Sequence, residues 1–218
     1  LIERLNRNGK AVCTVSFLGK RNVAGLSGSG SHTLTDCRSE GRVYTAFAPG
    51  ACYLGGSGGD GGQAGIVGFI SAGARLERCV NAGEVYAGRA AGVGGIVGSA
   101  GSSGTEVTLF QCANQGAVSN DTAAVLLNKG GTGGVLGLAA AGTVTVRSCY
   151  NTGSVTGSAK AGGIVGQLNK GTIENCYSIG DIGGKASQKG GIFAFSSATV
   201  KNCYYTLPEA ETLGGTAA

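Results

Sequence analysis

The 218-residue sequence has no methionine, no tryptophan, one histidine and two prolines. A collagen-like triple helix is excluded, because it needs proline-rich Gly-X-Y triplets. No stretch approaches the roughly 18 consecutive apolar residues of a membrane-spanning helix, so we expect no membrane insertion. Charged residues are also scarce, at 13%, and the lysines and arginines behind the net charge of +5 are scattered along the chain. We therefore expect no nucleic-acid partner, since such proteins cluster their basic residues.

Glycine, by contrast, is abundant, with 44 residues in the chain. Average usage is roughly 7%, so glycine is about threefold enriched. The 42% hydrophobic content argues against a solvated, flexible linker. A regular structure must therefore use these glycines.

An internal repeat runs through most of the chain. A glycine-bracketed apolar pair, such as Gly95-Ile-Val-Gly98, recurs six times and is followed 12 to 17 residues later by a cysteine. An aliphatic residue stands three positions before each cysteine. The six cysteines of this pattern are Cys37, Cys79, Cys112, Cys149, Cys176 and Cys203.

The repeat unit is too short for helices. No segment between glycines reaches the roughly ten to twelve residues that a stable helix needs, and valine, isoleucine and threonine favour strands. Three short strands per unit, with glycines where the backbone takes positive φ or bends sharply, describe one coil of a parallel β-helix. We predict an all-β fold, a right-handed parallel β-helix (β-solenoid) of about six coils stacked about 4.8 Å apart.

The irregular segments lie outside the coils. We expect an N-terminal cap over residues 1–22, the solenoid over 23–206 and a tail over 207–218. Insertions at 44–62 and 119–131 each follow the third run of their coil, where solenoids often carry binding loops. Because the chain starts with leucine, we expect either a processed mature protein or a piece of a longer one.

Part of the repeat resembles a known family. Gly162-Gly-Ile-Val-Gly166 followed by Ile173-Glu-Asn-Cys-Tyr177, together with Ser148-Cys-Tyr-Asn-Thr-Gly-Ser-Val155, is similar to GLUG-motif repeats. GLUG repeats occur in secreted and surface-anchored bacterial proteins, including adhesin-like proteins and regions that accompany immunoglobulin A peptidases. The resemblance implies a β-solenoid and an extracellular or cell-surface location in bacteria. It implies no catalytic residue, because the repeat is a scaffold.

The cysteines favour a structural role. Six of them recur once per coil, which is typical of a buried ladder of small hydrophobic side chains. Zinc sites need two cysteines close in sequence, and the chain has no C-x-x-C pair, so we expect no metal and no cofactor. Free buried thiols are the favoured interpretation. The alternative is one or more disulfides, involving above all Cys13 and Cys52, which lie off the ladder.

Catalytic patterns are weak. Ser57 in Gly55–Gly59 matches the G-x-S-x-G pattern with His32 as a nominal base, but it lacks the strand-to-helix turn that this motif needs. Polysaccharide-active enzymes need two carboxylates within about 5 to 9.5 Å, and the 12 acidic residues are dispersed. We expect no catalytic residue. A polysaccharide hydrolase or lyase is the third alternative.

Aromatic residues are the candidate binding groups. One tyrosine directly follows the cysteine in each of the last three units, so a column of stacked rings is expected. That column either faces outward as a binding platform or inward as part of the core. The candidates are Tyr150, Tyr177 and Tyr204 in this column and Tyr44, Phe47 and Tyr53 in the first insertion.

Together these patterns favour a non-catalytic extracellular module of a bacterial surface or secreted protein. It would act as an adhesin-like binding or stalk region that contacts a host glycan or an extracellular protein. The alternative is a self-assembling subunit of an extracellular filament or layer, since open strand edges are templates for association.

Overall fold

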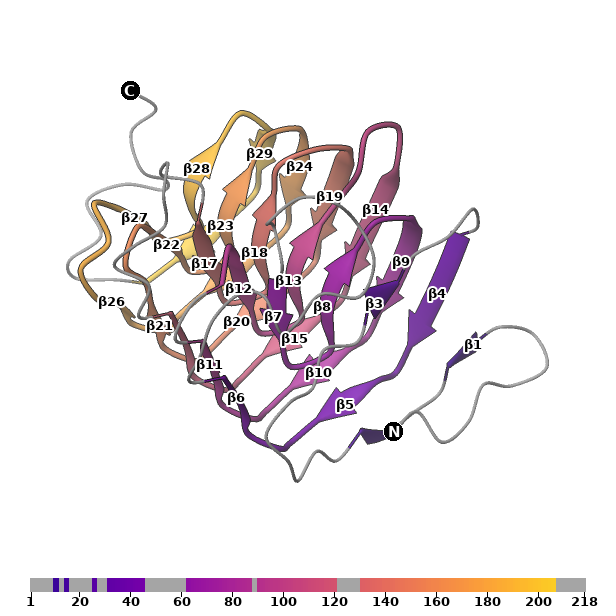
Figure 1. The fold of residues 1–218 in the computed structure, drawn as a ribbon. Coiled ribbons are helices and arrows are strands. Elements are labelled where there is room, and N and C mark those ends of the chain that lie inside the picture. Colours follow the sequence, from indigo (N-terminus) through magenta and orange to yellow (C-terminus); the bar gives the residue numbers. More distant parts are fainter. Residues whose placement is uncertain are drawn as a thin grey trace.

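The computed structural model describes residues 10–11, 14–15, 25–26, 31–45, 62–87, 90–120 and 130–206. In these residues the regular structure is β-strand throughout, without a helix. The strands pair in parallel with the equivalent strands of the neighbouring coils, as the pairs β4–β9 and β19–β24 illustrate. The chain therefore forms a right-handed parallel β-helix, which confirms the predicted fold, and Figure 1 shows the coils following one another from indigo to yellow.

Two seven-stranded sheets hold the longest and the shortest strands of the coil. Sheet 1 consists of β1 (Lys10–Ala11), β4 (Ser31–Thr35), β9 (Gly73–Glu77), β14 (Glu106–Phe110), β19 (Thr143–Arg147), β24 (Gly171–Glu174) and β29 (Thr199–Lys201). Sheet 2 follows it in each coil and consists of β2 (Thr14–Val15), β5 (Arg38–Ser39), β10 (Val80–Asn81), β15 (Ala113–Asn114), β20 (Tyr150–Asn151), β25 (Tyr177–Ser178) and β30 (Tyr204–Tyr205).

Three further sheets complete the coil. Sheet 3 consists of β6 (Val43–Thr45), β11 (Val85–Ala87), β16 (Val118–Asn120), β21 (Val155–Thr156) and β26 (Ile182–Gly183). Sheet 4 consists of β7 (Gly62–Ala64), β12 (Gly92–Gly94), β17 (Gly131–Gly133), β22 (Lys160–Gly162) and β27 (Gln188–Gly190). Sheet 5 consists of β3 (Gly25–Leu26), β8 (Val67–Ile70), β13 (Val97–Ala100), β18 (Leu136–Ala139), β23 (Val165–Leu168) and β28 (Phe193–Ser196).

The expectation of three strands per coil is wrong, because each complete coil has five. Sheet 2 was missed because its strands are two residues long. Sheet 4 was missed because its strands are rich in glycine, which is depleted in strands and reads as turn. The glycine-bracketed pair is not a single strand, since the chain turns at Gly95 and Ile96 between β12 and β13.

The segments expected outside the coils are described only in part. Strands β1 and β2, within the expected cap, pair in parallel with β4 and β5 and so add a rung to sheets 1 and 2. The segments 46–61, 121–129 and 207–218, which hold most of the two insertions and the tail, lie outside the described residues. The proposed domain boundaries therefore stay predictions.

Positive φ angles occur at the corner between sheets 1 and 2. The residue just before each ladder cysteine has a φ between 49° and 57°, and none of these residues is glycine. The backbone N–H of Asp36, for example, still donates to the carbonyl of Glu77 in the next coil, so the corner keeps its hydrogen bonds. The corner residues are Asp36, Arg78, Gln111, Ser148, Asn175 and Asn202.

The repeat glycines serve close approach instead. A Cβ on Gly95 would lie 2.1 Å from Oδ1 of Asn114, which faces it from sheet 2. A Cβ on Gly92 would lie 2.3 Å from the carbonyl oxygen of Gly98, because sheets 4 and 5 face each other across this gap. Real Cβ atoms do not approach other atoms so closely, so any side chain here would force the backbones apart. We call this contact of sheets 4 and 5 the glycine arch.

Lys160 interrupts the row of glycines in the glycine arch. Gly62, Gly92 and Gly131 begin the earlier strands of sheet 4, whereas Lys160 begins β22. The ladder between β17 and β22 pairs only Thr132 with Ala161 and Gly133 with Gly162, so Lys160 lies outside it. Lys160 Nζ donates to Oε1 of Gln167 over 2.8 Å and lies 5.1 Å from the ring centroid of Phe195.

Buried asparagines link successive coils at the corner after sheet 2. Nδ2 of Asn81 donates to Oδ1 of Asn114, and Nδ2 of Asn114 donates to Oδ1 of Asn151, over 2.8 and 2.7 Å. Each amide also donates to a carbonyl two residues later in its own coil, as Asn114 does to Gly116. All three side chains are fully buried, so these bonds satisfy polar groups that water cannot reach.

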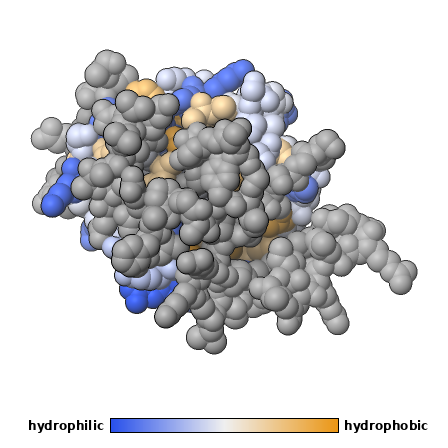
Figure 2. All heavy atoms as spheres, viewed as in Figure 1, coloured by the Kyte–Doolittle hydropathy of each residue, from blue (hydrophilic) through white to orange (hydrophobic). Residues whose placement is uncertain are grey.

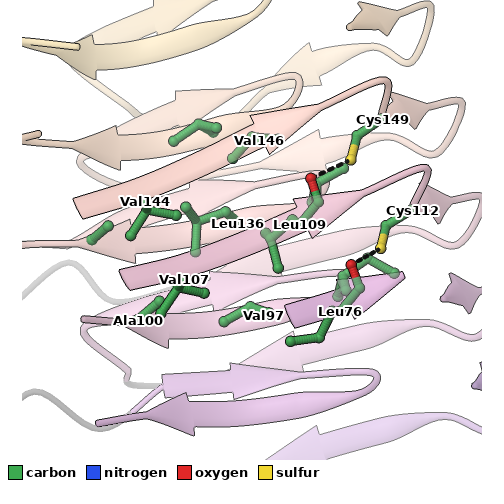
Figure 3. Close-up of a cluster of buried hydrophobic side chains, with 14 of the residues drawn as sticks. Leu76, Val97, Ala100, Val107, Leu109, Cys112, Leu136, Val144, Val146 and Cys149 are labelled. Carbon is green, nitrogen blue, oxygen red and sulfur yellow. Dashed lines mark hydrogen bonds between the residues drawn. The ribbon is translucent and has the colours of Figure 1, made fainter. Parts of the chain in front are cut away.

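The interior divides into two apolar clusters. The larger lies between sheets 1 and 5, with Leu76, Leu109 and Val146 as members, and Figure 3 shows these side chains stacked coil upon coil. The smaller lies between sheets 3 and 4 and includes Val85 and Val93. In the view of Figure 2, hydrophilic residues lie largely at the outline, and hydrophobic ones show nearer the middle.

Candidate binding surface

The tyrosine column faces outward from sheet 2. Tyr150 pairs in register with Tyr177, and Tyr177 pairs with Tyr204. The residue that follows Tyr150 is Asn151 of the buried ladder, so alternation along the strand turns the tyrosine to the outside. Tyr177 is 43% and Tyr204 is 72% exposed. Of the two orientations left open by the sequence, the structure has the outward one.

The first two rings of the column are stacked on each other. The centroids of Tyr150 and Tyr177 are 5.1 Å apart and the ring planes differ by 4°. Nε2 of Gln115 donates to the hydroxyl of Tyr150 over 3.3 Å. Ile179, two residues after Tyr177, is 52% exposed. We call Tyr150, Tyr177, Ile179 and Tyr204 the aromatic strip.

A second pair of stacked tyrosines lies on sheet 3. Tyr44 pairs with Tyr86, with centroids 4.7 Å apart and an interplanar angle of 14°. The guanidinium carbon of Arg42 lies 5.1 Å from the ring centroid of Tyr44, which is 40% exposed. The other two candidates of the first insertion, Phe47 and Tyr53, lie outside the described residues.

The ladder cysteines form one column within the larger core. All six are free, and only Cys203 in the last rung is not fully buried. Each thiol from the second onward lies near a carbonyl of the preceding coil, as for Cys112 with Leu76 and Cys149 with Leu109 at 3.6 and 3.5 Å (Figure 3). Burial raises the pKa of the Cys149 thiol well above its ordinary value, so this thiol stays protonated and unreactive. A pairing of Cys13 with Cys52 lies outside the described residues.

An ionic network covers the first coils. Arg78 binds both carboxylate oxygens of Asp36, at 2.7 and 2.9 Å, and also pairs with Glu77. Arg75 pairs with the other oxygen of Glu77 at 3.0 Å. The hydrogen bond from Arg78 lowers the pKa of the Asp36 carboxyl. Two carboxylates of adjacent coils are thus close together, contrary to expectation, but guanidinium groups bind both of them.

In the described residues of the last coils, basic side chains outnumber acidic ones. In the described residues 31–87, four arginines face four carboxylates, and all eight take part in ion pairs. In residues 130–206, one arginine and five lysines face only Glu174 and Asp181, and Glu174 pairs with Arg147. Four of these lysines are exposed and form no ion pair with a described carboxylate: Lys170, Lys185, Lys189 and Lys201.

The described residues offer no prepared catalytic or metal centre. No group of three or more histidine, cysteine or carboxylate side chains among them could hold a metal ion. His32 lies in β4, while Ser57, its nominal partner, lies outside the described residues. No helix in the described part of the chain is long and apolar enough to cross a membrane.

Sequence reasoning missed three parts of this surface. Tyr86 could have been found, because it follows Val85 as Tyr44 follows Val43 in the aligned units. Ile179 stands in a column that is otherwise polar or small, with Gln115 and Thr152 before it. The lysines of the last coils are separated along the sequence, and only the structure shows which of them lack a described carboxylate partner.

One solved structure resembles this fold. It is the crystal structure of a Bacteroides ovatus protein provisionally named an immunoglobulin A1 protease, with a TM-score of 0.56 and 20% sequence identity. The match covers 84% of this chain and 53% of the other, so the chain spans about half the length of that protein. No protein-family model matches the sequence, and no curated protein matches it. At this identity the likeness concerns the β-solenoid fold.

Proposed function

We propose that the chain is a non-catalytic binding module of a bacterial protein that acts outside the cell or at its surface. The observation that carries the proposal is the aromatic strip: Tyr177, Ile179 and Tyr204 lie exposed on one outer face of the solenoid, and the half-buried Tyr150 stacks on Tyr177. Large apolar side chains gathered on a surface are typical of interaction sites. The fold supplies a rigid backbone on which they hold fixed positions.

The bacterial and extracellular setting rests on two resemblances. The repeat cores are similar to GLUG motifs, which occur in surface and secreted bacterial proteins. The structural neighbour comes from Bacteroides and carries the provisional name of an immunoglobulin A1 protease. Both are consistent with a scaffold that presents a binding surface, and neither assigns a catalytic residue to this chain.

The binding role is tested by probing arrays of immobilised host glycans and extracellular-matrix proteins with the purified chain. We expect at least one ligand to bind the native chain and to lose most of its signal with the double variant Tyr177→Ser/Tyr204→Ser. The control is Phe110→Ser, which removes an aromatic side chain from sheet 1 instead. Equal loss in both variants, or no ligand on either array, would contradict the proposal.

The non-catalytic part has its own test. Immunoglobulin A1 is incubated with the purified chain, because the neighbour's name makes this substrate the obvious candidate. We expect the antibody to remain intact on a denaturing gel. Specific fragments that persist after the chain is repurified would show that the chain is an enzyme.

A further inference from the structure

We propose that the partner of the aromatic strip is an acidic polypeptide segment, which rests on the binding function proposed above. The strip and the unpaired lysines lie in the same coils. Lys201 ends β29 in sheet 1, three residues before Tyr204, and Lys185 follows β26 in sheet 3. Sheets 1 and 3 flank sheet 2 in the coil, so Lys201 precedes the strip along the chain, and Lys185 follows it beyond the exposed Asp181.

Charge complementarity selects an anionic partner. Among the described residues 31–87, every arginine and every carboxylate takes part in an ion pair. The exposed lysines of the last coils have no described carboxylate partner and are available to one from outside. A field of one sign steers an oppositely charged partner and speeds its association.

The ring geometry favours a polypeptide over a glycan. Tyr150 and Tyr177 are stacked with an interplanar angle of 4°, so their facing surfaces cover each other. A sugar packs its C–H face against an open ring face, and the facing surfaces of these two rings are not open. Ile179, 52% exposed beside them, offers aliphatic contact that suits apolar side chains. Tyrosine is also among the residues that most often carry binding energy between proteins.

The experiment is an unbiased selection. A phage library of random dodecapeptides is panned on the native chain and, separately, on Tyr177→Ser/Tyr204→Ser. We expect the native chain to enrich peptides that combine aspartate or glutamate with aromatic or aliphatic residues, and the variant not to do so. Circular dichroism and thermal melting confirm that the variant is folded.

The affinities of variants for a selected peptide then separate the contribution of the tyrosines from that of the lysines. For a selected peptide, the tyrosine variant should bind about tenfold or more weakly, as expected when central interface residues are truncated. The variant Lys185→Gln/Lys201→Gln should bind more weakly at low salt and show a flatter salt dependence, because screening acts on the lost charges. The control Phe110→Ser should bind like the native chain.

Three outcomes would overturn the inference. If the enriched peptides are no more acidic than the starting library, the charge argument fails. If oligogalacturonate or hyaluronate binds through the strip more tightly than any selected peptide, the partner is an acidic glycan, and the proposed binding function survives without this inference. If neither peptides nor glycans bind, both proposals fall.

Discussion

The first and the last coils share one backbone and place different chemistry on it. In residues 31–87, arginines and carboxylates neutralise one another, and the facing strands of sheets 4 and 5 touch through glycine. In residues 130–206, tyrosines and unpaired lysines lie on the outside of the coils, and Lys160 stands where glycines begin the earlier strands of sheet 4. Because the coils repeat, these differences are changes at equivalent positions. They show which positions the fold needs and which are free to carry function.

A lysine placed in the tight part of the glycine arch should lower the stability of the fold most. Gly92→Lys copies Lys160 into the preceding tight part of the arch, where a Cβ would lie 2.3 Å from the carbonyl oxygen of Gly98. We expect this overpacking to lower the free energy of unfolding by about 3 kcal/mol or more, or to prevent folding. Urea denaturation followed by circular dichroism measures the loss.

The reverse change is the control. Lys160→Gly removes the hydrogen bond to Gln167 and the contact with Phe195, but introduces no clash. We expect a loss of about 1 kcal/mol, typical of one such hydrogen bond. Similar losses of stability in both variants would mean that the glycine arch is packed no more tightly at position 92 than at position 160.

A break in the row of buried asparagines should cause the next largest loss of stability. Asn114→Ala leaves the carbonyl of Gly116 and Oδ1 of Asn151 without their donor inside a dry corner. We expect a loss of about 2 to 3 kcal/mol, because unsatisfied buried polar groups keep their full desolvation cost. Differential scanning calorimetry gives the size of the effect. Ser178→Ala, at the end of the same column, should cost less, since Ser178 accepts only the 3.3 Å bond from Asn151.

The repeat predicted sheet 1 well and the rest of the coil less well. The aliphatic residue three positions before each cysteine fixed the alignment, and the structure pairs Leu76 with Leu109 and Leu109 with Val146 in that register. Strands of five residues show an alternation of buried and exposed side chains that a sequence can reveal. A two-residue strand such as β20 shows none, so the outward direction of Tyr150 could not be derived.

The chemistry of the corners was predicted least. Glycine suggested positive φ, and five described glycines, Gly101 among them, have it. The positive φ that recurs in every coil falls on Asp36 and its equivalents, while Gly95 has room for no side chain because Asn114 faces it. Such contacts join residues in different sheets, and no local pattern encodes them. The asparagines two positions after Cys79, Cys112 and Cys149 were visible in the alignment, but their meaning depends on that contact.

The cysteine column should show a kinetic difference between its ends. In a background with Cys13 and Cys52 replaced by serine, we expect one thiol, Cys203, to react promptly with a colorimetric disulfide reagent. The five buried thiols should react about a hundredfold more slowly or worse, because the coil must open first. Adding Cys203→Ser should abolish the fast phase. A fast phase of several equivalents would show that the column is not closed.

The smallest effect on stability is expected at the corner residues between sheets 1 and 2, whose side chains form different contacts at the two ends of the solenoid. Arg78 holds Asp36 through two charged hydrogen bonds, whereas Asn202 donates to Asn175 over 3.2 Å at the other end. Because the pKa of Asp36 is lowered in the folded state, its stabilising contribution is present above the ordinary carboxyl pKa of about 3.9 and fades as pH falls through the folded value. Arg78→Gln should therefore raise the pKa of Asp36, as followed by carboxyl NMR titration. Asn202→Ala should leave that titration unchanged. If Asp36 titrates alike in the native chain and in Arg78→Gln, the pairing does not persist in solution, as is common for exposed ion pairs.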